Sequence, residues 1–215
     1  MVQTAQRKII RPADYLETLT AMRDFTESRN DDTPDELWQV EHPAVFTLGQ
    51  AGQDRHVLNP GNIPIVRTER GGQVTYHGPG QVVIYTLIDI RRRGLFVRDT
   101  VCRLEQAIIE TLSYFGIANA QRKPDAPGVY VPNSGATNET DRLWKIAALG
   151  LKVSRGRTYH GVALNVGMDL EPFSRINPCG YPGLRTVDMA TMGINAEWQD
   201  VADQLCDQID RHCQT

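Results

Sequence analysis

The sequence predicts an α+β fold in which helices pack on a mixed central β-sheet. Residues 81–90, QVVIYTLIDI, form a nearly unbroken run of β-branched and aromatic residues, typical of a strand buried on both faces. Residues 97–115 and about 196–213 repeat apolar residues at helical spacing. A chain of 215 residues can bury a full core without disulfides, so we expect one domain over 1–215.

The first half of the chain contains one helix before its strands. Apolar residues recur at helical spacing after Pro12, which we expect in the first turn of that helix. A polar loop follows, and short β-branched and apolar runs then predict strands over 37–40, 44–48 and 63–67.

The second half combines a helix, three strands and a structured loop. Gly116 is placed to end the helix over 97–115. The remaining expected elements are a strand over 128–131, a polar and mobile stretch over 132–142, strands over 145–153 and 159–166 joined by a turn at 155–157, and a loop rich in proline and glycine over 171–183.

Composition excludes several classes of protein. The formal net charge of −3 argues against nucleic-acid binding, which usually needs a basic face. The N-terminal segment has no apolar signal region, and no apolar run reaches the roughly 20 residues of a membrane span. The four cysteines form neither a CxxC pair nor a zinc-binding pattern. We therefore expect a cytosolic protein with reduced thiols.

Two glycine-containing segments leave room for a ligand. Residues 70–81, RGGQVTYHGPGQ, place four glycines and a proline directly before the buried strand, where a tight turn is the alternative interpretation. This segment matches neither nucleotide-binding glycine motif. Residues 145–150, KIAALG, begin a strand with small residues that leave space for a lipid-like chain. Lys145 taken alone is typical of a solvated edge residue.

A cysteine and three possible partners suggest nucleophilic chemistry. Cys179 lies in the loop INPCGYPG, where proline and glycine present the thiol instead of packing it. A free thiol has a pKa of about 8.5, and a nearby cation lowers it. His77, His160 and Lys145 are the candidate partners, and the sequence does not choose between a Cys–His and a Cys–Lys pair. In the segment 159–166, Gly161 weakens strand packing unless another group approaches it.

Taken together, these segments resemble the lipoyl(octanoyl) transferases. The motifs RGGQVTYHGPGQ, KIAALGLKV, YHGVALNV and INPCGYPG follow one another in the order found in that family, and LWQVEHPAVFTLGQ at 37–50 fits the same family. The resemblance covers roughly 37–189. It is specific, because four separate motifs match in order.

The resemblance implies the fold of the biotin/lipoate protein ligase group and no metal or nucleotide cofactor. It implies octanoyl–acyl carrier protein as donor, with the lipoyl domains of 2-oxoacid dehydrogenases and the glycine-cleavage H protein as acceptors. The acyl-thioester cysteine of the family corresponds to Cys179, and its partner lysine corresponds to Lys145. The acyl-pocket segments correspond to Arg70, Gly71, Gly72, Gln73, Val74, Thr75, Tyr76 and His77, to Ala148, Leu149 and Gly150, and to Gly161, Val162 and Ala163.

The resemblance also leads to expectations about catalysis and docking. Backbone N–H groups near Gly180 or Gly150 are candidates to hold an oxyanion. Arg91, Arg92, Arg93 and Arg98 form a basic cluster that we expect to dock an acidic carrier, with a solvated turn as the alternative.

Three other functions remain open from the sequence. An ATP-dependent lipoate or biotin ligase would share the fold but needs no nucleophilic cysteine. A non-catalytic module would bind acylated carriers or lipoyl domains without turnover. A Cys–His hydrolase would release free octanoate.

Overall fold

The main sheet is mixed, as the sequence predicts. The computed structural model describes residues 4–133, 135–137 and 142–214, apart from the side chain of Cys179. Among the described residues, one pair of strands in the main sheet, at one edge, is parallel, and the other neighbouring strands are antiparallel. In spatial order, the seven strands of the described residues are β1 (Gln6–Ile10), β2 (Glu36–Val40), β6 (Gln81–Leu87), β10 (Arg157–Asn165), β9 (Leu143–Ser154), β8 (Val129–Pro132) and β7 (Gln121–Arg122).

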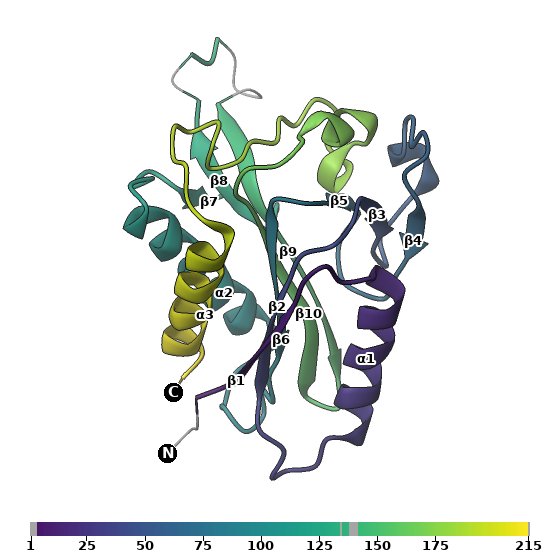
Figure 1. The fold of residues 1–215 in the computed structure, drawn as a ribbon, viewed down its shortest axis with the longest axis vertical. Coiled ribbons are helices and arrows are strands. Elements are labelled where there is room, and N and C mark those ends of the chain that lie inside the picture. The colour runs from purple at the N-terminus through teal and green to yellow at the C-terminus, as the bar shows by residue number, and fades with distance from the viewer. Residues whose placement is uncertain (1–3, 134, 138–141, 215) are drawn as a thin grey trace.

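A second, smaller sheet lies beside the main sheet (Figure 1). Its central strand pairs with one neighbour in parallel and with the other antiparallel. In spatial order its strands are β4 (Ile65–Arg67), β3 (Val45–Leu48) and β5 (Val74–His77).

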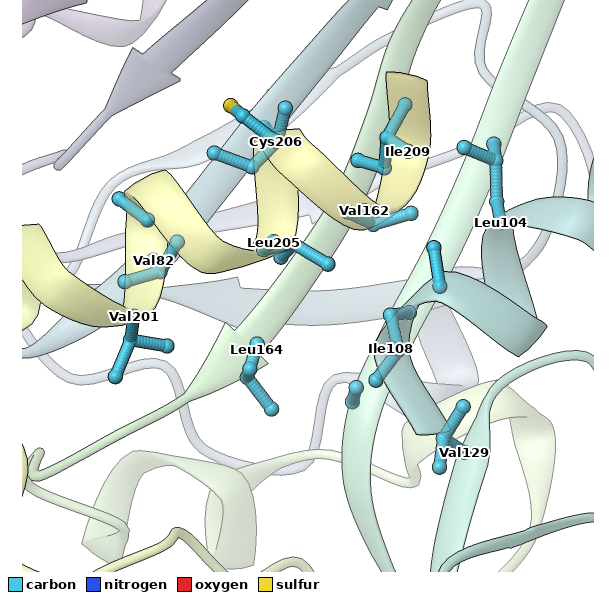
Figure 2. Packing of buried hydrophobic residues seen from close by; sticks show 14 of the residues in the cluster. Val82, Leu104, Ile108, Val129, Val162, Leu164, Val201, Leu205, Cys206 and Ile209 are labelled. Carbon is cyan, nitrogen blue, oxygen red and sulfur yellow. The ribbon is translucent and has the colours of Figure 1, made fainter. Parts of the chain in front are cut away.

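Helices cover both faces of the main sheet (Figure 1). Helices α2 (Val97–Tyr114) and α3 (Trp198–Cys213) pack against each other and on one face, and α1 (Tyr15–Ser28) covers part of the other. Figure 2 shows the core beneath α2 and α3, where buried side chains such as Ile108 and Leu205 meet Val162 of β10. Burying one such side chain stabilises the fold by about 1.5–3 kcal/mol.

The ends of two helices follow from local chemistry. Asp14 caps α1, because its carboxylate accepts hydrogen bonds from the N–H groups of Leu16 and Glu17 at 2.9 and 3.0 Å. Pro12 therefore precedes the cap, and its expected place in the first turn is wrong. Gly116 follows α2 with φ of +96°, as predicted for a residue that ends a helix.

Most of the other predicted elements are confirmed. The strands over 37–40, 44–48 and 63–67 correspond to β2, β3 and β4, and the hairpin turn at 155–157 joins β9 to β10. The loop over 171–183 contains two short 3₁₀ turns, η3 (Glu171–Arg175) and η4 (Pro178–Gly180). A third, η1, spans Asp54–His56. Part of the stretch 132–142 lies outside the described residues, so the expectation of mobility there stays a prediction.

No described helix combines the length and the apolar character needed to cross a membrane.

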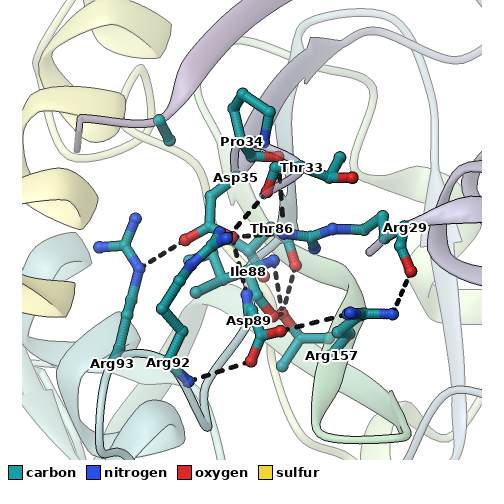
Figure 3. A network of polar contacts seen from close by, with 12 residues as sticks. Arg29, Thr33, Pro34, Asp35, Thr86, Ile88, Asp89, Arg92, Arg93 and Arg157 are labelled. Atoms are coloured by element: carbon teal, nitrogen blue, oxygen red, sulfur yellow. Dashed lines mark hydrogen bonds and ion pairs between the residues drawn. The ribbon is translucent and has the colours of Figure 1, made fainter. Parts of the chain in front are cut away.

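The predicted docking role of the arginine cluster is wrong for Arg93, because it is buried and pairs inside the protein (Figure 3). Arg93 is fully buried and donates to Asp35 at 2.6 Å and to the carbonyl of Cys213 at 2.9 Å. Arg92 donates to the other oxygen of Asp35 at 2.7 Å. Arg91, although exposed, pairs with Asp89 at 3.3 Å. Arg91, Arg92 and Arg98 are exposed, so a docking role for these three stays a prediction.

Asp35 is the centre of this network. Its carboxylate also pairs with buried Arg29 and accepts a hydrogen bond from the N–H of Asp89 at 2.8 Å. Burial favours the neutral acid, but the Asp89 N–H and the guanidinium groups of Arg93 and Arg29 outweigh it and lower the pKa of Asp35. A carboxylate whose pKa is lower in the folded state stabilises the fold above its unfolded pKa, and this stabilisation is lost as the pH falls through the folded value.

We predict that Asp35→Ala lowers the free energy of unfolding by about 3–5 kcal/mol, because it leaves buried guanidinium groups without their carboxylate. Urea denaturation at neutral pH measures the change. The matched control is Asp32→Ala at an exposed neighbouring position, for which a change within about 0.5 kcal/mol is expected. Equal changes in the free energy of unfolding for the two substitutions would contradict a stabilising role of the Asp35 network.

Candidate functional site

A cavity of about 60 Å³ lies between the main sheet and the smaller sheet. This volume is several times what one water molecule needs. The main sheet contributes small residues to one side of the cavity: Ala148 and Gly150 from β9, and Gly161 and Ala163 from β10. The opposite side is formed by Arg70, Gly72, Gln73, Val74, Thr75 and His77.

Two of the strand glycines are required by close backbone contacts. A Cβ atom on Gly161 would lie 2.0 Å from the carbonyl oxygen of Ile84 in β6. A Cβ atom on Gly150 would lie 2.8 Å from the carbonyl oxygen of Gly71. Gly150 and Gly161 are direct partners across β9 and β10, so any side chain at this level of the sheet would displace a neighbouring backbone.

Lys145 is buried at one end of the cavity, with only 4% of its surface exposed. Its ammonium group donates to the carbonyl of Pro127 at 3.0 Å and lies 5.4 Å from the ring centre of Tyr130. Its backbone pairs with the segment after the Cys179 loop: its N–H donates to Arg185, and Val187 donates to its carbonyl, both at 2.9 Å. The interpretation of Lys145 as a solvated edge residue is therefore wrong.

Cys179 is the central residue of η4, and its side chain lies outside the described part of the structure. Its neighbour Pro178 lines the same cavity as Lys145. The structure thus brings the backbone next to Cys179 and the Lys145 side chain to one cavity. The N–H of Gly180 already donates to the carbonyl of Asn177 at 2.9 Å, which counts against Gly180 as an oxyanion donor.

Arg70 is a buried cation held by backbone oxygens. One terminal nitrogen donates to the carbonyls of Thr47 and Gln73 at 2.7 and 2.8 Å, and to the Thr47 hydroxyl at 2.9 Å. The other donates to the carbonyl of Gly71 at 2.9 Å. Arg70 thereby fixes the loop that faces β9 and β10.

Two buried histidines, His77 and His160, line the cavity, and a third, His42, contacts His77; burial makes each of them harder to protonate. Burial and the nearby His42 lower the pKa of His77 to about 3. Burial and the Arg70 cation lower the pKa of His160 to about 3, and burial lowers that of His42 to about 4. All three imidazoles are therefore neutral at neutral pH.

His77 and His160 are the two histidines that the sequence offered as partners of Cys179. The Nδ1 of His77 lies 2.7 Å from the side-chain oxygen of Gln81, and its Nε2 lies 3.4 Å from the Thr47 hydroxyl. The Nε2 of His160 lies 3.2 Å from the Thr68 hydroxyl. Both rings thus take part in hydrogen bonds away from η4, which favours Lys145 as the partner.

His160 adopts a backbone conformation that is uncommon in a strand. Its φ is +61°, in the left-handed region. Strand alternation alone would place His160 on the opposite face from Tyr159, but the two rings stack with centroids 5.1 Å apart. The positive φ thus brings the imidazole to the cavity side, which strand periodicity does not predict.

Twelve of the fourteen predicted pocket residues line the cavity. Gly71 does not line the cavity, and its carbonyl oxygen instead lies close to the backbone of Gly150. Tyr76 points into the smaller core, where its ring contacts Phe46 and Phe173 with centroids 5.6 and 5.4 Å away. Lining residues that the sequence analysis did not assign to the pocket are Tyr15, Gln81, Val83, Tyr85, Ala147, His160, Asn165, Phe173, Pro178 and Thr186. For Tyr15, the one sequence feature that indicated burial was its place on the apolar face of α1.

Among the described residues, no three His, Cys, Asp or Glu side chains are grouped so that they could hold a metal ion.

Comparisons with known proteins agree on the family. A family model described as the lipoyl protein ligase A/B catalytic domain matches residues 14–210. The octanoyltransferase of Polaromonas naphthalenivorans is 57% identical over 204 residues, which cover 89% of this chain and 91% of that protein. The octanoyltransferase of Bordetella petrii is 58% identical over 201 residues, covering 94% and 92% of the two chains.

Solved structures with low sequence identity share the fold. A bipartite lipoate protein ligase from Thermoplasma acidophilum, studied with its E2 lipoyl domain, superposes with a TM-score of 0.73 at 14% identity and covers 98% of this chain and 84% of its own. A biotin protein ligase from Aquifex aeolicus gives a TM-score of 0.57 at 10% identity, with coverage of 97% and 70%.

We predict that His42, His77 and His160 remain neutral at pH 5, because their pKa values are lowered to about 4 or less. Histidine NMR titration, assigned with single His→Gln variants, measures this. The unfolded chain binds protons near pH 6.5, so stability should fall as the pH drops from about 6.5 toward 4. A titration midpoint near 6.5 for these rings would contradict the prediction.

Proposed function

The chain belongs to the lipoyl protein ligase A/B catalytic domain family, and from this premise we propose a two-step transfer of an octanoyl group through Cys179. The protein is an acyltransferase that transfers octanoyl groups to lipoyl domains, in keeping with its octanoyltransferase relatives. We treat residues 1–215 as one catalytic domain acting in the cytosol. The observation that carries the two-step mechanism is the buried Lys145 ammonium group in the cavity that Pro178, next to Cys179, also lines.

The donor in this proposal is octanoyl–acyl carrier protein. The acceptors are lysines on the lipoyl domains of 2-oxoacid dehydrogenase E2 subunits and on the glycine-cleavage H protein. The reaction is then the first step of endogenous lipoate synthesis. An acyl thioester is already activated, so the transfer requires neither ATP nor another cofactor.

In the first step Cys179 takes the octanoyl group. The pair begins as a Cys179 thiolate and a Lys145 ammonium, because Lys145 has taken the thiol proton, and the thiolate attacks the thioester carbonyl. The bond to the carrier sulfur breaks, and the carrier thiolate takes the proton from Lys145. One thioester replaces another, so this exchange is nearly balanced in energy. Lys145 is left neutral.

In the second step the neutral amine of the acceptor lysine attacks the Cys179 thioester. The C–N bond forms, the C–S bond breaks, and Lys145 takes the proton that the amine loses. The products are an amide, the Cys179 thiolate and the Lys145 ammonium, which is the pair that begins the next cycle. An amide is more stable than a thioester, so this step is effectively irreversible.

The rival functions have less support. The solved ligases share the fold at 10–15% identity, whereas octanoyltransferases match at 54–58% over most of the chain. A Cys–His hydrolase would need His77 or His160, whose imidazoles are buried and face other partners. A pure binding module would not need a buried lysine beside a cysteine loop.

We predict that octanoyl–acyl carrier protein alone, without acceptor or ATP, adds one octanoyl group to the protein, as measured by intact mass. Cys179→Ser should form no labile adduct, and added lipoyl domain should discharge the adduct of the wild-type protein. The matched control is Cys102→Ser, which removes an exposed thiol outside the cavity and should acylate normally. Transfer only from free acid and ATP would identify a ligase instead.

We predict that Lys145→Ala raises the pH at which Cys179 is alkylated by iodoacetamide by about one unit or more, because it removes a nearby cation. The measurement uses a Cys102→Ser background so that the exposed thiol does not react. Lys145→Arg keeps the charge but cannot release the proton. It should therefore alkylate at a lower pH than Lys145→Ala while losing transfer. An alkylation profile unchanged in Lys145→Ala would remove Lys145 from this role.

A further inference from the structure

Buried rings line the cavity near the level of Gly150 and Gly161, five residues along β9 from Lys145. Tyr15 of α1, Tyr85 of β6 and His160 of β10 line it there, and we call these three residues the end wall. Tyr85 pairs with Gly161 and Gly161 with Gly150, so the end wall lies at the level of the two glycines.

The depth of the cavity suits a short acyl chain. Lys145 and Gly150 are five residues apart on β9, which corresponds to roughly 16 Å at about 3.3 Å per strand residue. An extended octanoyl group spans roughly 9 Å from carbonyl carbon to methyl, given single bonds of about 1.5 Å in a zigzag. The difference between these two lengths leaves room for the thioester linkage near Lys145 and for van der Waals contact between the methyl group and the end wall.

The end wall is held in place by contacts behind it. The hydroxyl of Tyr85 donates to His42 Nε2 at 2.7 Å, since His42 Nδ1 donates to the carbonyl of Ala13, also at 2.7 Å. The Tyr15 ring packs on His42 with centroids 5.1 Å apart. His160 Nε2 lies 3.2 Å from the Thr68 hydroxyl. Rings fixed in this way cannot easily move aside for a longer chain.

The end wall is also uncharged at neutral pH. Burial raises the pKa of Tyr85 well above its ordinary value and also raises that of Tyr15, and the pKa of His160 is lowered to about 3. A methyl group can therefore rest against the end wall without facing an unpaired charge.

We propose that Tyr15, Tyr85 and His160 set the acyl chain length of this enzyme, with Tyr15 of α1 as the residue that closes the cavity at eight carbons. The proposal rests on the proposed function, because it takes the acyl carbonyl to lie at the Lys145 end. It assigns to α1, which lies before the segments that carry the family motifs, a direct part in substrate choice.

The test is a competition assay in which hexanoyl-, octanoyl-, decanoyl- and dodecanoyl–acyl carrier protein are mixed with lipoyl domain, and the products are counted by mass. Ratios of products do not depend on how much active enzyme is present. For the wild-type protein we expect less decanoyl than octanoyl product. Tyr15→Ala should raise the decanoyl-to-octanoyl ratio by about 16-fold, the product of about fourfold for each of two further buried methylenes.

Three further variants distinguish an effect of the end wall on product ratios from a general loosening of the packing of α1. Tyr15→Phe keeps the ring and should keep the wild-type ratio. Met22→Ala removes a buried α1 side chain that does not line the cavity, and it should leave the product ratios unchanged. Ala163→Val fills the middle of the cavity and should favour hexanoyl over octanoyl. If Tyr15→Ala does not fold, Ala163→Val provides the test instead.

The outcomes are distinct for the two proposals. Absence of octanoyl transfer by the wild-type protein would reject the proposed function itself. Normal octanoyl transfer together with equal use of decanoyl, or with a ratio unchanged in Tyr15→Ala, would reject the end wall. A shift of equal size in Met22→Ala would reject it as well, because the effect would then come from a loosened α1.

Discussion

The pairing of β9 with β10 is the constraint on which the site depends. Register places Gly150 opposite Gly161 and Ala148 opposite Ala163, so four small residues meet in the middle of the sheet. On the other face of the same strands, Val162 and Leu164 pack under the helices. One hairpin therefore supplies both a dense core and an open cavity, because strand residues alternate between faces. A shift of register by one residue would exchange the two faces.

The sequence predicted those elements whose stability comes from burial. Helices α2 and α3 and strand β6 were found because their apolar residues follow the period of a helix or a buried strand. Strands β1 and β7 were missed, since both lie at sheet edges with mainly exposed residues and carry no such period. Strand β5 was hidden because four glycines surround it, which is also the signature of a turn.

The site was predicted less completely, for reasons of long-range geometry. The family resemblance supplied most of the residues that line the cavity, but composition around Lys145 indicated an exposed side chain. The chain buries it because β8 and the segment after the Cys179 loop flank β9 there. Likewise, a run of three arginines indicated a docking surface. Two of these arginines form ion pairs with Asp35, more than fifty residues earlier, and no local sequence pattern shows this pairing. Tyr15 carried the signal of a core residue and no signal for a ligand.

The contacts of α3 have a consequence for biosynthesis. Asp210 near its end accepts a hydrogen bond from the N–H of Ala5, 205 residues earlier, and Arg93 reaches the carbonyl of Cys213, 120 residues later. Contacts of such high sequence separation form late in folding. As the chain leaves the ribosome, the apolar face of the sheet that α3 covers stays open until α3 emerges. During that interval the nascent protein exposes an apolar surface that favours aggregation, so chaperone dependence should persist until α3 is available to cover it.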